Sequence, residues 1–69
     1  MQLTFLGSTS QNGGSPTLFK TSRATFIVQG YRITDPEALS QMNIPEHETV
    51  VEVPTDLLYQ FLPPGEKQR

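Results

Sequence analysis

The chain is 69 residues long and contains no cysteine, so it forms one small domain that no disulfide stabilises. Its net charge of −2 argues against a domain that neutralises many phosphates, and no run of about 18 apolar residues is present to span a membrane. The N-terminus lacks the basic lead of a signal peptide, so we expect a cytoplasmic protein. A domain of this size is close to the limit for folding alone, which favours a homodimer or docking on a partner.

The N-terminal residues predict a strand followed by a long loop. Apolar and polar residues alternate from Gln2 to Leu6, which is a strand pattern, and the pattern ends at Gly7. The polar segment 8–16 contains Asn12-Gly13-Gly14, where asparagine and glycine provide the positive φ of a tight turn. This segment is predicted to be a loose connection between two strands.

The segment from Thr17 to Ile33 predicts two strands around a turn, and we expect it to form the middle of the sheet. Residues 18–21 are the second strand, and Ser22-Arg23 is the turn that reverses the chain. The long strand 24–33 contains an apolar run whose side chains point to both faces, so both faces are expected to be covered. Gly30 interrupts this strand, which indicates a bulge or the close approach of another backbone or a bulky side chain.

A short helix is predicted after the long strand. Asp35 followed by Pro36 fits an N-cap and a first helical residue. Thr34 and Glu37 stand at the spacing of a capping box, so both patterns place the start of a helix here. The helix is expected to run for about two turns and to end before Asn43.

A fourth strand and a second helix complete the predicted fold. Alternating residues predict the strand over 49–53, and Thr55 or Asp56 then caps a second short helix. Its apolar stripe consists of Leu57, Leu58, Phe61 and Leu62. Residues 63–69 are expected to form a disordered C-terminal tail. The order β-β-β-α-β-α over residues 1–62 indicates a single α+β domain, a small antiparallel sheet of about four strands with two short helices.

No group of residues predicts catalysis or metal binding. His47 is the single histidine and lies between Glu46 and Glu48 in a predicted exposed turn, without a serine on a rigid element beside it. Neighbouring side chains in an extended turn diverge, so these three residues do not converge on one metal ion. The glycine-rich segment 7–14 is not followed by the lysine and Ser/Thr of a phosphate-binding loop. We therefore expect a non-enzymatic protein without a cofactor.

Three basic residues are candidate contacts to nucleic acid. Lys20, Arg23 and Arg32 could gather at one end of the central hairpin, with an aromatic side chain nearby for base stacking. The segment 32–53 also resembles the proline-started helix and following strand of AbrB-like swapped-hairpin DNA-binding domains. The same segment is rich in acidic residues, which weighs against DNA binding. A DNA-binding transcriptional regulator is therefore the alternative function.

Three motifs of the chain resemble a group of short uncharacterised actinobacterial proteins. The motifs are Pro16-Thr17-Leu18-Phe19, Val28-Gln29-Gly30-Tyr31 and Val50-Val51-Glu52-Val53-Pro54. The resemblance covers the chain from about Phe5 to Leu58. Members of this group occur beside helix-turn-helix regulators, so the resemblance implies an accessory regulatory or antitoxin-like role and supplies no catalytic residues.

The leading hypothesis is a homodimeric protein-interaction module whose protein partner, following the resemblance, is a helix-turn-helix regulator. Its expected interface combines the exposed side of the central hairpin with the C-terminal helix. The predicted interface residues are Phe19, Ile27, Tyr31, Arg32, Leu58 and Phe61.

Overall fold

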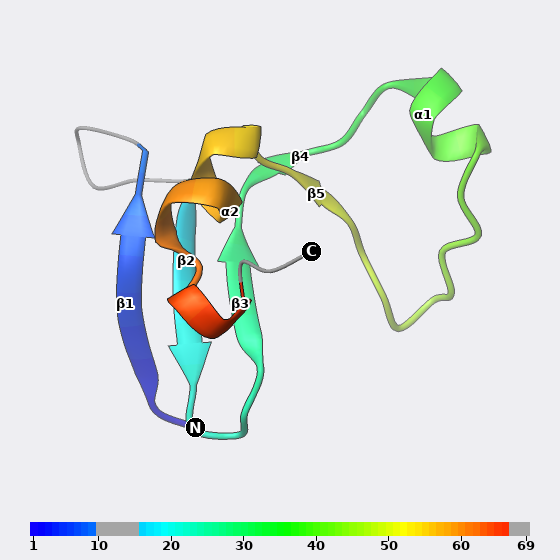
Figure 1. The fold of residues 1–69 in the computed structure, drawn as a ribbon. Helices are drawn as coiled ribbons and strands as arrows, with labels where there is room; N and C mark the ends of the chain where they lie inside the picture. The colour runs from blue at the N-terminus through cyan, green and yellow to red at the C-terminus, as the bar shows by residue number, and fades with distance from the viewer. Residues whose placement is uncertain (10–15, 67–69) are drawn as a thin grey trace.

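The computed structural model describes residues 1–9 and 16–66, and Figure 1 shows how its elements are arranged. An antiparallel sheet in the order β1-β2-β3 is formed by β1 (Leu3–Ser8), β2 (Thr17–Thr21) and β3 (Phe26–Gln29). A second, two-stranded antiparallel sheet is formed by β4 (Tyr31–Arg32) and β5 (Val51–Glu52). The helical elements are α1 (Pro36–Ser40), α2 (Thr55–Phe61) and the 3-10 helix η1 (Pro64–Glu66). The predicted fold class, a small antiparallel α+β domain with two short helices, is confirmed.

The middle strand of the larger sheet is β2, and not the long strand predicted over residues 24–33. Gly30 divides that strand into β3, at the edge of one sheet, and β4, in the other. A Cβ atom on Gly30 would lie 2.5 Å from Val53 Cγ1 and 2.7 Å from the Glu52 carbonyl oxygen, which confirms the close approach predicted at this glycine. The expectation that both faces of the ribbon are covered is wrong, because Ile27 in β3 is 36% exposed.

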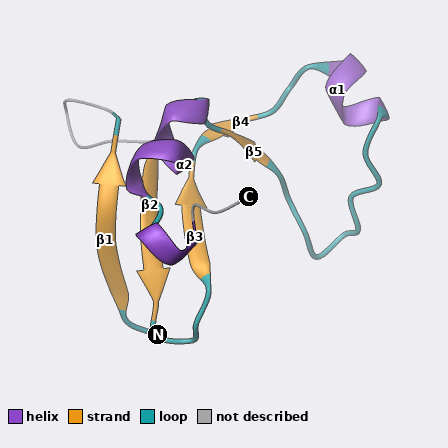
Figure 2. Cartoon of the chain, viewed as in Figure 1, coloured by secondary structure: helices purple, strands orange, loops and turns teal. Residues whose placement is uncertain are grey.

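A β-bulge in β1 shapes the face of the sheet on which α2 lies. Phe5 pairs with Phe19 and Gly7 pairs with Leu18, so Leu6 is an extra residue in β1. Gly7 is buried, and the ring of Phe61 fills the place that a Cβ atom on this glycine would take. The missing side chain therefore allows α2 to lie directly on the strands, as Figure 2 shows.

The core lies between α2 and the three-stranded sheet. Leu18 of β2 and Leu57 of α2 are 0% exposed, and they are the two fully buried apolar side chains in the part of the chain that the structure describes. α2 contacts both β1 and β2. On the outer side of the helix Tyr59 is 75% exposed. The helix therefore covers one face of the sheet, and on the opposite face Phe5 and Ile27 are exposed in the described structure.

The start of α2 differs from the prediction. The N-cap is Pro54, without a capping side chain, and the backbone N–H of Leu57 donates to the Pro54 carbonyl at 3.1 Å. Thr55 and Asp56, predicted as caps, are instead the first two helical residues, because the extended backbone already ends at Pro54. Beyond α2, η1 occupies residues 64–66, where the sequence predicts a tail.

The segment between β4 and β5 forms an arm that extends to the side of the larger sheet (Figure 1). Asp35 is the N-cap of α1, and its Oδ2 accepts a hydrogen bond from the Ala38 backbone N–H at 3.0 Å, which confirms the predicted helix start at Pro36. The helix ends at Ser40, earlier than predicted, and the fourth strand is limited to Val51–Glu52. The predicted Asn12-Gly13-Gly14 turn and residues 67–69 lie outside the described residues.

Candidate functional site

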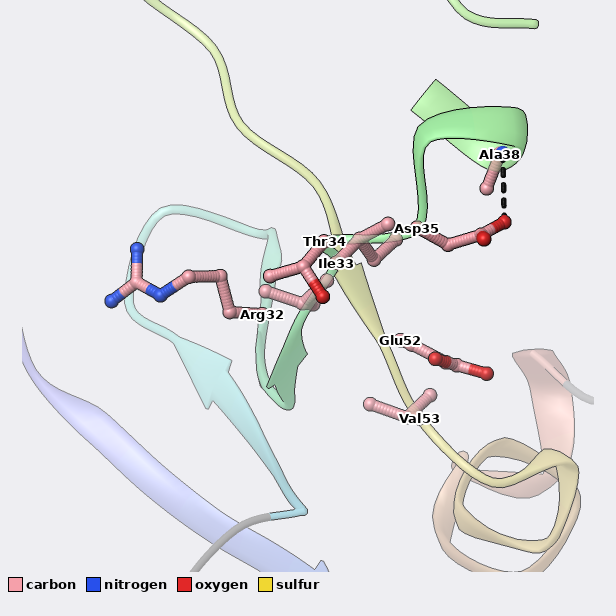
Figure 3. A pocket seen from close by; sticks show the side chains of 8 residues that line it. Arg32, Ile33, Thr34, Asp35, Ala38, Glu52 and Val53 are labelled. Atoms are coloured by element: carbon pink, nitrogen blue, oxygen red, sulfur yellow. Dashed lines mark hydrogen bonds between the residues drawn. The ribbon is translucent and has the colours of Figure 1, made fainter. Parts of the chain in front are cut away.

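A hollow of about 710 Å³ lies between the small sheet and the first turn of α1. It is lined by Arg32, Ile33, Thr34, Asp35, Ala38, Val51, Glu52 and Val53. Figure 3 shows that the side chain of Arg32 extends away from Asp35, whose carboxylate turns to the backbone of Ala38. A ligand site needs a few polar groups that converge on one place. The charged side chains around this hollow diverge, so it offers no such set.

His47 lies in an exposed turn, as the sequence predicts. The Glu48 backbone N–H donates to the Pro45 carbonyl at 2.9 Å and closes the turn. The His47 side chain is 82% exposed, and its Nε2 is 3.9 Å from the Glu48 carboxylate. Within residues 1–9 and 16–66 no three His, Asp or Glu side chains are grouped closely enough to hold a metal ion.

The three predicted nucleic-acid contacts do not gather at one end of the hairpin. Lys20 lies near the β2–β3 turn with its Nζ 5.3 Å from the centroid of the Phe26 ring, and Arg23 lies in that turn. Arg32 lies in β4, beyond the other end of β3 (Figure 1). A strand of four residues is about 13 Å long, so β3 separates Arg32 from the other two cations.

Charge is divided unevenly along the chain. All seven acidic residues follow Thr34, whereas residues 1–34 carry three basic residues and no acidic one. The strands of the larger sheet therefore contain no acidic side chain. This division is hidden in the net charge of −2, because the acidic second half outweighs the basic first half.

The sheet face opposite α2 exposes apolar side chains at its centre and toward β1, whereas Thr17 and Thr21 on the same face are buried. Phe5, Phe19 and Ile27 are paired across the three strands, and because side chains alternate along a strand they point away from the face that contains Leu18. Leu3 lies two residues before Phe5 and shares its face. Phe5 is 62% exposed, Leu3 46% and Ile27 36%. We call these four residues, Leu3, Phe5, Phe19 and Ile27, the open patch.

The two aromatic rings of the open patch contact each other. The ring centroids of Phe5 and Phe19 are 6.2 Å apart and their planes meet at 73°, which is an edge-to-face arrangement. The hydroxyls of Thr21 and Thr25 hydrogen-bond to each other at 2.6 Å at the end of the same hairpin. The patch is thus an ordered aromatic surface rather than an isolated exposed side chain.

The six predicted interface residues fall in three places. Phe19 and Ile27 lie together in the open patch. The other four lie in β4 and α2, and they are Tyr31, Arg32, Leu58 and Phe61. Phe61 packs over Gly7 in the core and is half-buried, so it is occupied by the fold itself. The structure therefore does not unite the six residues into one surface.

Leu3 and Phe5 were missed by the sequence prediction of the interface. The signal that could have found them is their alternation with Gln2 and Thr4, which places both side chains on one face of a strand. That pattern predicts the strand but does not show whether its apolar face is covered. Whether its apolar face is covered depends on where α2 lies, and this is a property of the tertiary structure.

Comparisons with models of protein families, with curated proteins and with solved structures find no match to this chain. Among the described residues no helix has the length and apolar character needed to cross a membrane. The resemblance to the short actinobacterial proteins stays a prediction.

Proposed function

We propose that the protein is a non-enzymatic protein-interaction module and that the open patch is its binding surface. The observation that carries the proposal is Phe5, whose aromatic side chain is 62% exposed and packs edge to face on Phe19. Burying apolar surface is worth about 25 cal/mol per Å², and contiguous exposed apolar surface is typical of binding sites. Aromatic residues are also enriched where interfaces gain most of their binding free energy.

The biological role that we propose is accessory and regulatory, or antitoxin-like. Its basis is the resemblance carried by the motifs at residues 16–19, 28–31 and 50–54, and a helix-turn-helix regulator is the candidate protein partner on the same basis. Such a role requires binding and no chemical step. It therefore agrees with a chain whose histidine is solvated and whose hollow beside the small sheet lacks convergent polar groups.

DNA binding is the second candidate function. It is favoured by the absence of acidic residues from residues 1–34, which leaves the larger sheet with a positive local charge. Its weakness is geometric, because β3 separates Arg32 from Lys20 and Arg23. Three dispersed cations neutralise few phosphates, so the open patch gives the interaction module the stronger support.

Co-purification from the native host followed by mass spectrometry tests the proposed function. The wild type is used as bait beside Phe5→Glu, which places a charge in the open patch, and Tyr59→Glu, which places the same charge on the outer side of α2. We expect the proteins retained by the wild type to be lost with Phe5→Glu and kept with Tyr59→Glu. The proposal is wrong if the two variants retain the same proteins as each other.

A further inference from the structure

We infer that the open patch binds the open patch of a second copy of this chain, so that two three-stranded sheets pack face to face about a two-fold axis. The inference rests on the proposed function, because it names the partner of the same surface.

The face that carries the open patch has no charge to hold two copies apart. Its four apolar residues are flanked in the same face by Thr17, Thr21 and Gln29, which are uncharged. The acidic residues all follow Thr34, and therefore lie outside the three strands. Two copies of a chain with a net charge of −2 can approach through this face without burying like charges against each other.

The shape of the face is suited to a copy of itself. Two sheets pack at about 10 Å with their strands inclined by about 30°, an angle that arises from the twist that both sheets share. A two-fold axis places the same residues on both sides, so each side of the contact is apolar and aromatic where the other is. The edge-to-face rings of Phe5 and Phe19 form an uneven surface, and side chains of the second copy can interdigitate with it.

The small core is a further reason to expect a second copy on the open patch. Leu18 and Leu57 are the two fully buried apolar side chains of the described structure, which is a small core for a chain of 69 residues. A second sheet would add a second apolar layer, and the dimer would be more stable than the monomer. A second copy is available wherever the chain is made, whereas a different protein has to be supplied.

The area of the face predicts a weak dimer. Three strands spaced by about 4.8 Å, each with about five residues at 3.4 Å, give a face of roughly 14 by 17 Å. Two such faces have a flat area of roughly 480 Å² in total, which is below the about 1,000 Å² of stable specific interfaces and falls in the range of weak, transient contacts. We therefore expect a dissociation constant in the micromolar range, and a monomer–dimer equilibrium that dilution shifts to the monomer.

Alkylation of a single introduced thiol tests this inference. The chain has no cysteine, so Leu3→Cys creates one reactive group at the edge of the open patch and keeps both phenylalanines. Tyr59→Cys is the matched control on the outer side of α2. From about 1 µM to about 1 mM protein we expect the alkylation rate of Leu3→Cys to fall about 10-fold and that of Tyr59→Cys to stay constant. Over the same range the wild type should change from monomer to dimer in sedimentation velocity.

Phe5→Glu provides the complementary measurement. Each dimer would carry two of the new charges in its interface, so we expect association to weaken at least about 100-fold. The inference is overturned if the wild type stays monomeric, if Phe5→Glu still dimerises, or if the thiol of Leu3→Cys reacts equally fast at all concentrations. Should Phe5→Glu unfold, the thiol measurement decides. If the wild type is monomeric but its co-purified proteins are lost with Phe5→Glu, this inference is overturned and the proposed function stands. If the wild type is monomeric and Phe5→Glu retains the same proteins as the wild type, both the inference and the proposed function are overturned.

Discussion

The ring of Phe61 lies directly above Gly7, in the space that the Cβ atom of any other residue at this position would fill. Gly7 is paired with Leu18 beside the bulge in β1, and both are buried. This contact fixes α2 on one face of the sheet. It therefore also decides which face of the sheet remains open.

Gly7→Ala should destabilise the protein by about 1–3 kcal/mol, because the added methyl group forces the ring of Phe61 out of its position. The measurement is urea denaturation followed by circular dichroism. Gly65→Ala is the matched control, since a Cβ atom there meets nothing within 4 Å. Both changes reduce the entropy of the unfolded chain alike, so their difference isolates the steric clash. Equal midpoints for the two variants would contradict the packing described for α2.

Leu57→Ala should lower the free energy of unfolding by about 2–5 kcal/mol, because it leaves a cavity beside Leu18 in a core with few members. Leu58→Ala, one residue further along the helix, removes a side chain that is 37% exposed and should cost less than about 1 kcal/mol. The same denaturation experiment measures both. A larger loss for Leu58→Ala would mean that α2 is rotated relative to the sheet.

Asp35→Ala should fray α1 and leave the unfolding of the sheet nearly unchanged. The variant removes the side-chain acceptor of the Ala38 N–H, which is worth about 1 kcal/mol to a helix. The arm that carries α1 extends to the side of the larger sheet (Figure 1), so this loss stays local. Amide hydrogen exchange should accelerate at Ala38 and Leu39 while the exchange of β2 is preserved. Faster exchange throughout β2 would show that the arm supports the sheet.

Duplex DNA should not be bound at about 150 mM salt. If the three cations of residues 1–34 make the phosphate contacts, the logarithm of the binding constant should fall by no more than about 2.7 for each tenfold rise in salt concentration. A gel shift measures DNA binding and its dependence on salt for the wild type and for a triple variant. The triple variant combines Lys20→Glu, Arg23→Glu and Arg32→Glu. Binding that persists at this salt concentration and is lost in the triple variant would favour the DNA-binding alternative.

Local chemistry made several parts of the fold predictable. Asp35 followed by Pro36 fixes a helix start within four residues, and the structure places the N-cap there. Gly30 signals close contact by its missing side chain, and Val53 provides that contact. These predictions succeeded because their causes lie within the few residues that carry the signal.

Strand order was not predictable in the same way. The apolar run in residues 26–28 suits a buried central strand and an edge strand equally well, and the choice depends on β1 pairing with β2 across a long loop. The open patch depends on the same long-range pairing, because Phe5, Phe19 and Ile27 come from three different strands. Phe61 was assigned to the interface for a related reason, since the helical stripe does not reveal that Gly7 leaves room for its ring.

Hydroxyl-radical footprinting with mass spectrometry tests most directly whether the open patch is an interface that this chain leaves uncovered. In dilute protein we expect Phe5 to be oxidised readily, as Tyr59 is, while Leu57 is protected. As the protein concentration rises, Phe5 should become protected and Tyr59 should not. Protection of Phe5 at the lowest concentration would show that its own chain covers the patch, and equal oxidation of Phe5 and Tyr59 at every concentration would show that no second copy binds there.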